Sequence, residues 1–396
     1  MRAETVAFVP VRYGPQVVGG AETLTRVLVE ELAARGWPVE VLTTCAIDPH
    51  SWNNYFPAGT EILSGITVRR FPTQSRRRDR KTARAETRMI LGKRVSVRHQ
   101  EMWIRSVVAS DALRAYIGEH RDDYRAFVFA PYLFGTTWQG VHEVPEKAYI
   151  IPCLHDEAYA YRKIYKQLMR SARGLMFNSV PEMELARRIY GKDLPGRVVG
   201  MGFAPHDAEG DRFRYKYSIE GDFVLYAGRR ESAKNTPALL QYFCNYLQNT
   251  GRDVSLVLTG TGRLDLPFAF YNRVIDVGYV GERDLRDAYD AATLICHPST
   301  RESLSIMILE AWLAGLPCLV HGDCAVTRYH VEQSGGGLWF KDYPTFHESL
   351  SYLLEDPARR AGMAEKGREY VLRNYSWDEV VGNFSAVIEE GERGRG

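Results

Sequence analysis

The sequence predicts an α/β protein made of two doubly wound domains, each with a parallel sheet covered by helices on both faces. Three observations lead to this fold class. The chain has 396 residues, more than one hydrophobic core usually spans, so two domains are expected. Short apolar runs alternate with segments of helical periodicity, and hairpin turn signals do not dominate. The alternation occurs in both halves of the chain.

The first half begins with a strand, a helix and a second strand. The helix is expected from Ala21 to Gly36, because Leu24, Leu28 and Leu32 fall on one helical face and a glycine ends the pattern. Strands are expected at five apolar runs: TVAFVPV (5–11), VEVLTT (39–44), FVFA (127–130), AYIIPCL (148–154) and GLMFNS (174–179).

The second half repeats this scheme. Helical patterns lie at residues 236–249, 283–292 and 304–314. The join between the halves is expected at residues 200–222, which are rich in glycine and charge and poor in periodicity. The expected strands are FVLYAG (223–228), SLVLTG (255–260), RVIDVG (273–278), TLICHP (293–298) and PCLVH (317–321).

The composition is that of a globular protein, with 45% hydrophobic and 25% charged residues. The formal net charge of +2 is too close to zero to indicate a nucleic-acid partner from bulk charge. Six cysteines are scattered without a CxxC pair, and several lie in apolar runs. This pattern favours buried free thiols in a reducing cytosol over disulfides or a zinc site.

Neither a signal peptide nor a membrane span is expected, because no apolar run approaches about 18 residues. Charge is concentrated locally, however. Between Arg76 and Arg98 the chain carries ten Lys and Arg residues against Asp79 and Glu86. We expect this stretch to form a long loop or a helical excursion. It is either a solvated loop or a surface for an anionic leaflet or a lipid-diphosphate acceptor.

The first candidate site is the pair Gly19 and Gly20 in YGPQVVGGAET, between the first strand and the first helix. Glycine lets the backbone approach a ligand, and the amides at a helix N-terminus suit an anion. The spacing is not the GxGxxG of dinucleotide-binding folds. An ordinary turn that uses glycine for positive φ is the commoner explanation of such a pair.

The second candidate site is YAGRRESAKNT, residues 226–236. A strand is expected to end at Gly228, and Arg229 and Lys234 follow before a helix that begins near Thr236. Cations at the carboxyl end of a parallel strand lie where open α/β sheets bind ligands. The alternative is an ordinary charged, solvated loop.

The third candidate site is RESLSIMILEAWLAGLP, whose helical run IMILEAWLA contains one polar side chain, Glu310. Glu302 is expected in the loop before the helix, and the hydroxyls of Ser303 and Ser305 are expected to cap the helix. A helix that is apolar nearly all round is buried. A buried carboxylate without partners is costly or gives up its charge, so ligand hydroxyls would be suitable partners for Glu310.

His155, in IIPCLHDEAY, is the fourth candidate, at the end of a first-domain strand. A lone histidine in such a place is more often structural than catalytic, and the HD pair also suits a turn or a helix cap.

Taken together, these segments resemble the retaining glycosyltransferase family 4, which has the GT-B fold and uses nucleotide-sugar donors. GRRESAKN is similar to the family's G-R-x-x-x-x-K phosphate motif, and Glu302 with Glu310 is similar to its E-x7-E motif. GGAE after the first strand and the HD of CLHDE also correspond, and the resemblance extends from about Val6 to YSWDEVVGNF. One departure is ESLS, where the family often has E-G-F-G.

The resemblance implies two doubly wound Rossmann-like domains facing across a cleft, with a C-terminal helix that crosses back to the first domain. The acceptor-side domain is expected at residues 1–205, the donor-binding domain at 206–376 and the returning helix at 377–396. The implied activity is transfer of a hexosyl unit, with retention of configuration, from a nucleotide-diphosphate sugar to a glycan or glycolipid acceptor. Surface polysaccharide or glycoconjugate synthesis is the implied setting.

By the same resemblance, catalysis is expected to depend on Glu302, His155, Lys234 and Arg229. Arg229, Lys234 and helix N-terminal amides would stabilise the diphosphate leaving group. Glu310 would hold the ribose hydroxyls, Glu302 the hydroxyls of the transferred sugar, and His155 would lie near the reacting centre. The expected donor site comprises Gly19, Gly20, Arg229, Lys234, Gly260, Tyr279, Val280, Glu302, Ser303, Leu304, Ser305, Ile306 and Glu310.

No cofactor is expected besides the donor, and the lack of an Asp-x-Asp triplet fits transfer without a metal ion. The base, the sugar and the acceptor stay open. Two other classes fit the same architecture, namely a nucleotide-sugar epimerase and a catalytically silent sugar-nucleotide binding protein. The expected location is cytoplasmic, either wholly or with peripheral attachment of Arg76–Arg98 to the inner face of the membrane, and no nucleic acid is expected.

Overall fold

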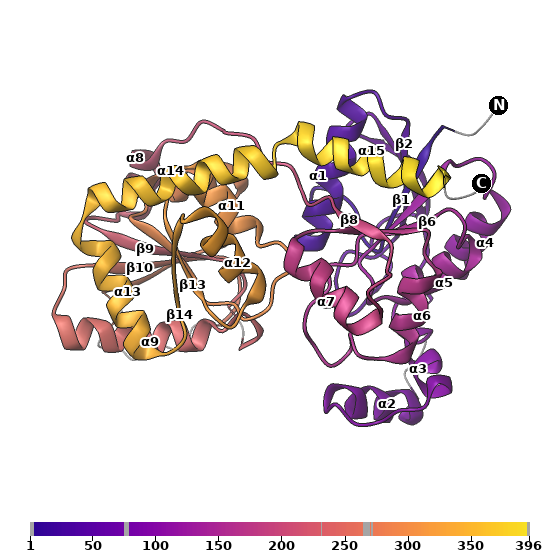
Figure 1. Ribbon diagram of the computed structural model, residues 1–396, viewed down its shortest axis with the longest axis horizontal. Helices are drawn as coiled ribbons and strands as arrows, with labels where there is room; N and C mark the ends of the chain where they lie inside the picture. The colour runs from indigo at the N-terminus through magenta and orange to yellow at the C-terminus, as the bar shows by residue number, and fades with distance from the viewer. Residues whose placement is uncertain (1–3, 75–78, 231, 264–269, 271, 394–396) are drawn as a thin grey trace. The chain divides into compact units, whose positions relative to one another are not determined.

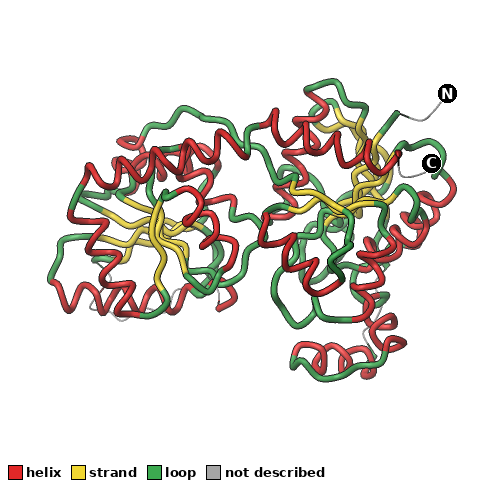
Figure 2. The backbone as a smooth tube through the Cα atoms, viewed as in Figure 1, coloured by secondary structure: helices red, strands yellow, loops and turns green. Residues whose placement is uncertain are grey.

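The computed structural model describes residues 4–74, 79–230, 232–263, 270 and 272–393. It divides into two compact units, of which unit 1 comprises Met1–Met201 with Val380–Gly396 and unit 2 comprises Gly202–Glu379. Each unit has a central sheet surrounded by helices (Figures 1 and 2). The predicted class, α/β with two Rossmann-like domains, is confirmed.

Unit 1 contains an eight-stranded sheet with the order β3-β4-β2-β1-β5-β6-β7-β8. Val6 lies opposite Val39 on one side and Ala126 on the other, and both pairings are parallel. Within the described residues, the β3–β4 hairpin is the one antiparallel pair of this sheet. The strands are β1 (Val6–Pro10), β2 (Val39–Thr44), β3 (Gly59–Leu63), β4 (Ile66–Phe71), β5 (Ala126–Ala130), β6 (Ala148–Ile150), β7 (Gly174–Phe177) and β8 (Gly196–Val198).

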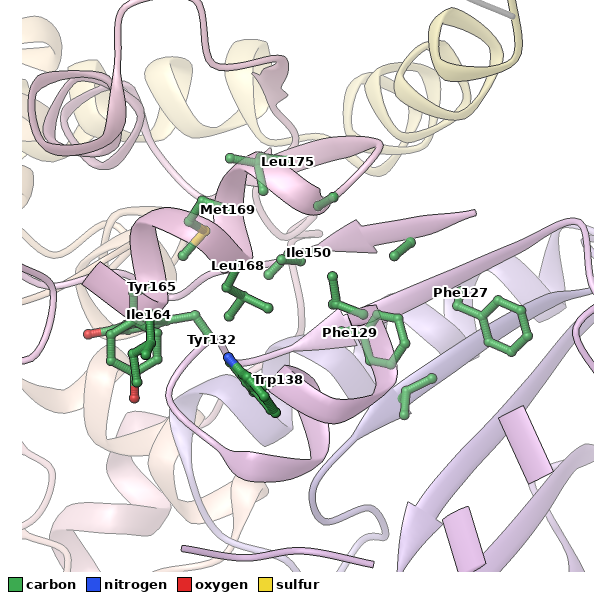
Figure 3. Close-up of a cluster of buried hydrophobic side chains, with 14 of the residues drawn as sticks. Phe127, Phe129, Tyr132, Trp138, Ile150, Ile164, Tyr165, Leu168, Met169 and Leu175 are labelled. Atoms are coloured by element: carbon green, nitrogen blue, oxygen red, sulfur yellow. The ribbon is translucent and has the colours of Figure 1, made fainter. Parts of the chain in front are cut away.

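Helices on both sides of this sheet supply its hydrophobic core. Figure 3 shows Phe127 and Phe129 of β5, Ile150 of β6, Trp138 and Leu168 packed together. All five residues of β5 are buried because helices cover both faces of the strand. The helices that pack on unit 1 are α1 (Gly20–Ala34), α2 (Arg80–Ile90), α3 (Val97–Ile104), α4 (Asp111–Glu119), α5 (Gly135–Glu143), α6 (Lys163–Ser171), α7 (Val180–Tyr190) and most of α15 (Trp377–Arg393).

The C-terminal helix α15 packs on unit 1 from Val380 onward. The ring of Phe384 stacks on Phe8 with their centroids 5.8 Å apart. The hydroxyl of Tyr149 donates to the carbonyl of Ile388 over 3.2 Å. These contacts attach the last helix to the first sheet, as the GT-B fold requires.

The basic stretch is helical in the part that the structure describes. Asp79 caps α2 by accepting a hydrogen bond from the amide of Thr82 over 2.7 Å, and Met89 anchors the helix in the core. Arg162 donates to the carbonyls of Met89 and Lys93, which holds the end of the helix. The predicted helical excursion is therefore correct for α2 and α3, whereas Arg76, Arg77 and Arg78 lie outside the described residues.

Unit 2 contains a six-stranded parallel sheet with the order β11-β10-β9-β12-β13-β14. Its strands are β9 (Phe223–Ala227), β10 (Ser255–Thr259), β11 (Val274–Gly278), β12 (Leu294–His297), β13 (Cys318–His321) and β14 (Gly337–Phe340). Its helices are α8 (Gly210–Tyr217), the 3-10 turn η1 (Ser232–Lys234), α9 (Thr236–Thr250), α10 (Glu282–Ala291), α11 (Ile306–Leu313), α12 (Ala325–Ser334), α13 (Tyr343–Glu355) and α14 (Pro357–Asn374).

The strand order of each sheet reverses at one point, and ligands of open α/β sheets bind at the carboxyl ends of the strands there. In unit 2 the chain runs outward from β9 through β10 to β11, and then returns to the other side of β9 as β12. The loops after β9 and β12 therefore leave the sheet side by side. They are the two segments that carry Arg229, Lys234 and Glu302.

Several predicted elements are shorter than expected, and two of them show why. AYIIPCL forms a strand only from Ala148 to Ile150, because Pro152 and Cys153, with φ 51°, follow. The helix expected over residues 304–314 is α11, Ile306–Leu313. In both cases the backbone leaves its regular conformation while the side chains stay apolar, so apolar periodicity overestimates the length.

Two glycines bring the backbone close together where β9 and β10 end, at the carboxyl edge of the sheet of unit 2. The amide of Gly228 donates to the carbonyl of Thr259 over 3.1 Å. A Cβ atom on Gly260, whose φ is 111°, would lie 2.0 Å from the carbonyl oxygen of Gly228. Gly260 is therefore required by backbone packing, independently of any ligand.

We predict that Gly260→Ala destabilises the protein by about 2 to 4 kcal/mol, because it adds a backbone clash to an unfavourable φ. Gly251→Ala is the matched control: its φ is also positive, at 62°, but a Cβ there meets nothing within 4 Å, so it should cost about 1 kcal/mol. Thermal unfolding of the two variants measures the difference. An equal loss of stability in the two variants would show that the close approach of Gly260 to the Gly228 carbonyl is unimportant.

Candidate functional site

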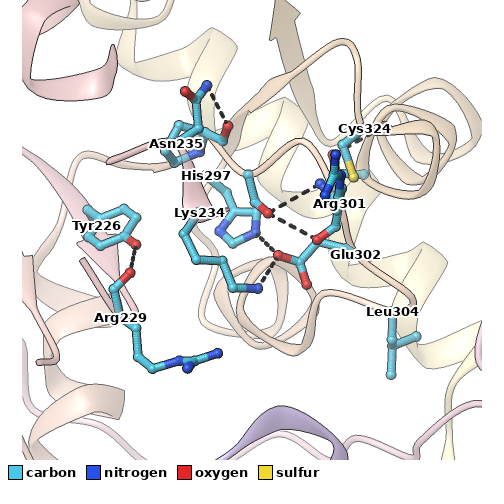
Figure 4. A network of polar contacts seen from close by, with 12 residues as sticks. Tyr226, Arg229, Lys234, Asn235, His297, Arg301, Glu302, Leu304 and Cys324 are labelled. Carbon is cyan, nitrogen blue, oxygen red and sulfur yellow. Dashed lines mark hydrogen bonds and ion pairs between the residues drawn. The ribbon is translucent and has the colours of Figure 1, made fainter. Parts of the chain in front are cut away.

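The candidate site of unit 2 is centred on Glu302, in the loop between β12 and α11. Its Oε1 atom accepts from the ammonium group of Lys234 over 2.7 Å and contacts Nε2 of His297 at 3.0 Å (Figure 4). The Glu302 side chain is 12% exposed. In the part of the chain that the structure describes, Oε2 of Glu302 has no hydrogen-bond partner, so it is available to a ligand.

The two partners of Glu302 determine its charge. Burial raises the pKa of the carboxyl group, but the hydrogen bond and charge of His297 and the ammonium group of Lys234 outweigh it. They hold the pKa of Glu302 well below its usual range. Glu302 is therefore a carboxylate at neutral pH, and because a carboxylate only accepts, Nε2 of His297 carries a hydrogen atom.

Sequence reasoning missed His297, which is the last residue of β12 and is 2% exposed. Its Nδ1 atom is buried without a partner among the described residues. The residue was included in an apolar strand, TLICHP. The available signal was a polar residue at the carboxyl end of a buried parallel strand, where ligands bind.

Lys234 lies in a loop that is fixed on both sides. The hydroxyl of Tyr226 donates to the carbonyl of Arg229 over 2.7 Å, and the side-chain amide of Asn235 donates to the carbonyl of Pro298 over 3.2 Å. The second bond joins this loop to the segment that precedes Glu302. Figure 4 shows Arg229 and Lys234 extending in the same direction from the loop.

The predicted capping of α11 by serine hydroxyls is wrong. Ser305 occupies the N-cap position, but its φ and ψ of 69° and 71° are left-handed and its side chain caps nothing. Its Oγ is buried without a partner among the described residues. Ser303 and Leu304 precede the helix. In the same described part of the chain, the amides of Ser305 and Ile306 have no acceptor, so they are available to an anion.

Glu310, in the middle of α11, has a protein partner that the sequence did not reveal. The hydroxyl of Tyr289 in α10 donates to Oε2 of Glu310 over 3.1 Å. Burial raises the pKa of Glu310 from 4.5 to about 7, although the bond from Tyr289 opposes the shift. A ligand is therefore not needed to explain why the helix tolerates this carboxyl group.

Gly260, Tyr279 and Val280 follow β10 and β11 at the same edge of the sheet. Arg230 fixes these two strand ends, because its guanidinium donates to the carbonyl of Gly260 over 2.8 Å and pairs with Asp276. Asp276 in turn accepts from the amide of Gly278 over 2.8 Å. Tyr279 is 65% exposed.

The remaining predicted residues belong to unit 1. Gly19 and Gly20 begin α1, where Arg12 pairs with Glu22 and donates to the carbonyl of Ile47 over 2.7 Å. A Cβ on Gly20 would meet nothing within 4 Å, so packing does not require glycine there.

His155 lies in the loop after β6. The buried carboxyl group of Glu182 accepts the amides of Leu154 and Asn178 and so fixes this loop. Burial raises the pKa of Glu182 to about 8, against the effect of these amides.

Among the predicted site residues, Lys234 and Glu302 are thus in direct contact. Glu310 is instead hydrogen-bonded by Tyr289, which was not predicted as a site residue. The structure contains no group of three or more His, Cys, Asp or Glu side chains suited to a metal ion among the residues it describes.

Comparison with known proteins shows what this region is similar to. Residues 208–370, which lie within unit 2, match the family described as Glycosyl transferases group 1. A D-inositol 3-phosphate glycosyltransferase of Xylanimonas cellulosilytica is 26% identical over 254 residues, 58% of this chain and 60% of that protein. An uncharacterized glycosyltransferase of Methanocaldococcus jannaschii is 25% identical over 43% of this chain and 45% of its own length. These matches span about half of each relative.

Solved structures share the fold over nearly the whole chain. Sucrose-phosphate synthase from Thermosynechococcus elongatus superposes with a TM-score of 0.73 and 19% identity, covering 98% of both chains. The Anabaena protein HepE, solved with UDP-glucose, gives 0.69 at 15% identity and 98% coverage of both chains. WaaG, a glycosyltransferase of lipopolysaccharide biosynthesis, gives 0.62 at 16% identity, covering 96% of this chain and 98% of WaaG.

The raised pKa of Glu310 has a consequence for stability. Because the folded state binds this proton more tightly than the unfolded state, the associated stability is complete below about pH 4.5 and is lost as the pH rises through about 7. Between pH 5 and 8 the wild type should lose roughly 1 to 3 kcal/mol relative to Glu310→Gln, which cannot ionise.

Thermal unfolding of the two proteins at a series of pH values, without ligand, measures this difference. Glu348→Gln, at an exposed carboxyl group of the same unit, should follow the wild type. Parallel pH curves for the wild type and Glu310→Gln would mean that Glu310 titrates normally.

Proposed function

We propose that this chain, whose second unit belongs to the group 1 glycosyltransferases and whose fold is GT-B, transfers a hexosyl unit from a nucleotide-diphosphate sugar to a glycan or lipid-linked acceptor. The transfer retains the anomeric configuration and needs no metal ion. The observation that carries the proposal is the ionised Glu302, held by Lys234 and His297 beside the N-terminus of α11, whose first amides have no acceptor among the described residues.

The cations of unit 2 would stabilise the leaving group. Cleavage of the sugar–phosphate bond leaves a nucleoside diphosphate with additional negative charge, and preorganised donors lower the barrier by stabilising it. The Lys234 ammonium group has three hydrogen atoms to donate, and the structure shows one bond, to Glu302. Its remaining hydrogen atoms would donate to phosphate oxygens, together with the Arg229 guanidinium and the amides of Ser305 and Ile306.

The two glutamates of α11 and its preceding loop would bind hydroxyl groups. Glu302 offers Oε2 to the transferred sugar while Oε1 keeps its partners. Glu310, already hydrogen-bonded by Tyr289, would accept from the ribose. Tyr279 and Val280 would contact the base through their backbone atoms, beside Gly260.

Unit 1 would supply the acceptor side. Gly19 and Gly20 would border the diphosphate, and His155 would lie near the reacting carbon as a positioning group.

HepE was solved with UDP-glucose, and a Corynebacterium glutamicum relative, 29% identical over 35% of this chain and 40% of its own length, is named as a GDP-mannose-dependent mannosyltransferase. UDP and GDP sugars are therefore the first donors to test, and surface polysaccharide or glycoconjugate synthesis, in the cytoplasm, is the setting we propose.

The basic surface of unit 1 would bring the protein to its acceptor. Ile90 and Leu91 are 56% and 61% exposed at the end of α2. No helix among the described residues has the length and apolar character to cross a membrane. Exposed cations around two exposed aliphatic side chains suit the surface of an anionic leaflet. The exposed cations are Arg80, Lys81, Arg84, Arg88, Lys93, Arg94 and Arg98.

We predict that Lys234→Ala lowers kcat/KM for the donor at least about 100-fold, roughly 3 kcal/mol of transition-state stabilisation. Release of nucleoside diphosphate from a panel of nucleotide sugars by hydrolysis, with water as the acceptor, is the measurement. Lys341→Ala removes an exposed lysine of the same unit and should leave turnover unchanged. Turnover of Lys234→Ala within about threefold of the wild type would refute the phosphate role.

For the membrane surface, we expect the full chain to sediment with vesicles containing phosphatidylserine and to be released by salt. The double variant Lys81→Ser/Arg84→Ser should reduce binding about 30-fold, since each basic residue near an anionic surface is worth about 1 kcal/mol. Ile90→Ser/Leu91→Ser should also weaken binding, because it removes the apolar contact with the lipid. Lys366→Ser/Arg373→Ser, at exposed positions of α14, is the control. Equal binding to neutral phosphatidylcholine vesicles would reject the surface.

A further inference from the structure

A buried histidine lies behind the segment that begins α11. His330 of α12 is 0% exposed. Its Nε2 atom contacts the carbonyl oxygen of Leu304 at 3.1 Å, and its Nδ1 atom contacts the hydroxyl of Tyr370 at 2.9 Å. The rings of Tyr370 and Tyr375 each pack 5.8 Å from its ring. Both ring nitrogens are thus occupied in a fully buried site.

The contacts determine the tautomer of His330. A carbonyl oxygen only accepts, so Nε2 carries the hydrogen and donates it to Leu304. Burial lowers the pKa of His330 to about 4, although the bond to Leu304 opposes the shift. The ring is therefore neutral at physiological pH, and Nδ1 accepts a hydrogen bond from the Tyr370 hydroxyl.

This bond fixes the direction of the next amide. In a trans peptide the C=O and N–H groups point to opposite sides of the chain. Because the carbonyl of Leu304 points to His330, the amide of Ser305 points away from it. Ser305 also has the left-handed φ of 69°, which is unfavourable for a non-glycine residue. Its own side chain makes no bond that would hold this conformation.

We propose that His330 is a positioning residue of the donor site. Its Nε2–H holds the carbonyl of Leu304 inward, which keeps the amide of Ser305, next to that of Ile306, directed at the diphosphate of the bound nucleotide. Tyr370 acts through His330 by fixing its tautomer. This inference rests on the proposed function, because it assumes that these amides receive the diphosphate.

The geometry distinguishes this role from simple core packing. A glutamine at position 330 can donate its amide hydrogen from about the position of Nε2, whereas a leucine fills the volume without a donor. Packing alone predicts similar nucleotide binding by both variants at temperatures where both are folded. Positioning predicts that only the variant with a donor binds nucleotide tightly.

Calorimetric titration of the full chain with UDP and with GDP tests this prediction. For the nucleotide that the wild type binds, His330→Leu should weaken affinity at least about tenfold and His330→Gln less than threefold, since one lost charge-assisted amide bond is worth about 1.5 to 3 kcal/mol. Leu350→Ala, in the core of unit 2, controls for destabilisation and should bind like the wild type.

Four results would overturn the inference: unchanged affinity in His330→Leu, loss in His330→Gln equal to that in His330→Leu, an equal loss in Leu350→Ala, or a wild type that binds neither nucleotide. Binding that Lys234→Ala abolishes and His330→Leu retains would overturn this inference alone. Binding that Lys234→Ala retains would instead refute the proposed function.

A second measurement tests the tautomer of His330 in the wild type, and so remains informative if a variant does not fold. Long-range ¹H–¹⁵N correlation of histidine-labelled wild type should show a neutral, Nε2-protonated ring at pH 7, assigned to His330 by its absence from His330→Gln. If His330→Gln is also unfolded, the assignment comes from Tyr370→Phe, which should shift the same resonance. An Nδ1-protonated or charged ring would overturn the inference.

Discussion

The organisation of the second unit depends on one buried carboxylate. Glu302 lies at the carboxyl edge of a parallel sheet, in surroundings that would by themselves make it give up its charge. It remains ionised because Lys234 and His297 both contact Oε1. Lys234 comes from the loop after β9 and His297 from the end of β12, so the carboxylate also joins the two strands where the sheet reverses direction. The charge of Glu302 and the alignment of the two loops therefore have the same cause.

A second group of contacts supports this arrangement from behind. Arg230 holds the ends of β10 and β11, Gly260 allows the backbone of β9 to approach, and His330 holds the carbonyl of Leu304. These contacts fix the loops that carry Arg229, Lys234 and the start of α11 at the edge of the sheet. Such preorganisation allows a site to stabilise developing charge without rearranging during the reaction.

The architecture could be predicted from the sequence, but the partners of the charged groups could not. The strands FVLYAG, SLVLTG and PCLVH are present to within a residue or two, because buried parallel strands are recognisable as short apolar runs. The capping of α11 by serine was wrong, because the bond that fixes this segment comes from His330, which lies 25 residues after Ser305 in the chain.

Tyr289 and His297 were missed for a related reason. Each belongs to an ordinary helix or strand, and only the folded structure shows which carboxyl group it contacts. The roles of the unit 1 residues stay predictions. The base, the sugar and the acceptor stay open, since local sequence does not show which polar groups of a ligand the folded site contacts.

The most direct measurement of the central claim is the response of two backbone amides to nucleotide. In a TROSY titration of the full chain with UDP or GDP, an oxygen of the diphosphate that accepts from Ser305 and Ile306 should move both amide resonances strongly downfield. Loss of the Lys234 charge should abolish the shift. Saturable nucleotide binding that leaves these two resonances in place would contradict the account, because the diphosphate would then lie elsewhere.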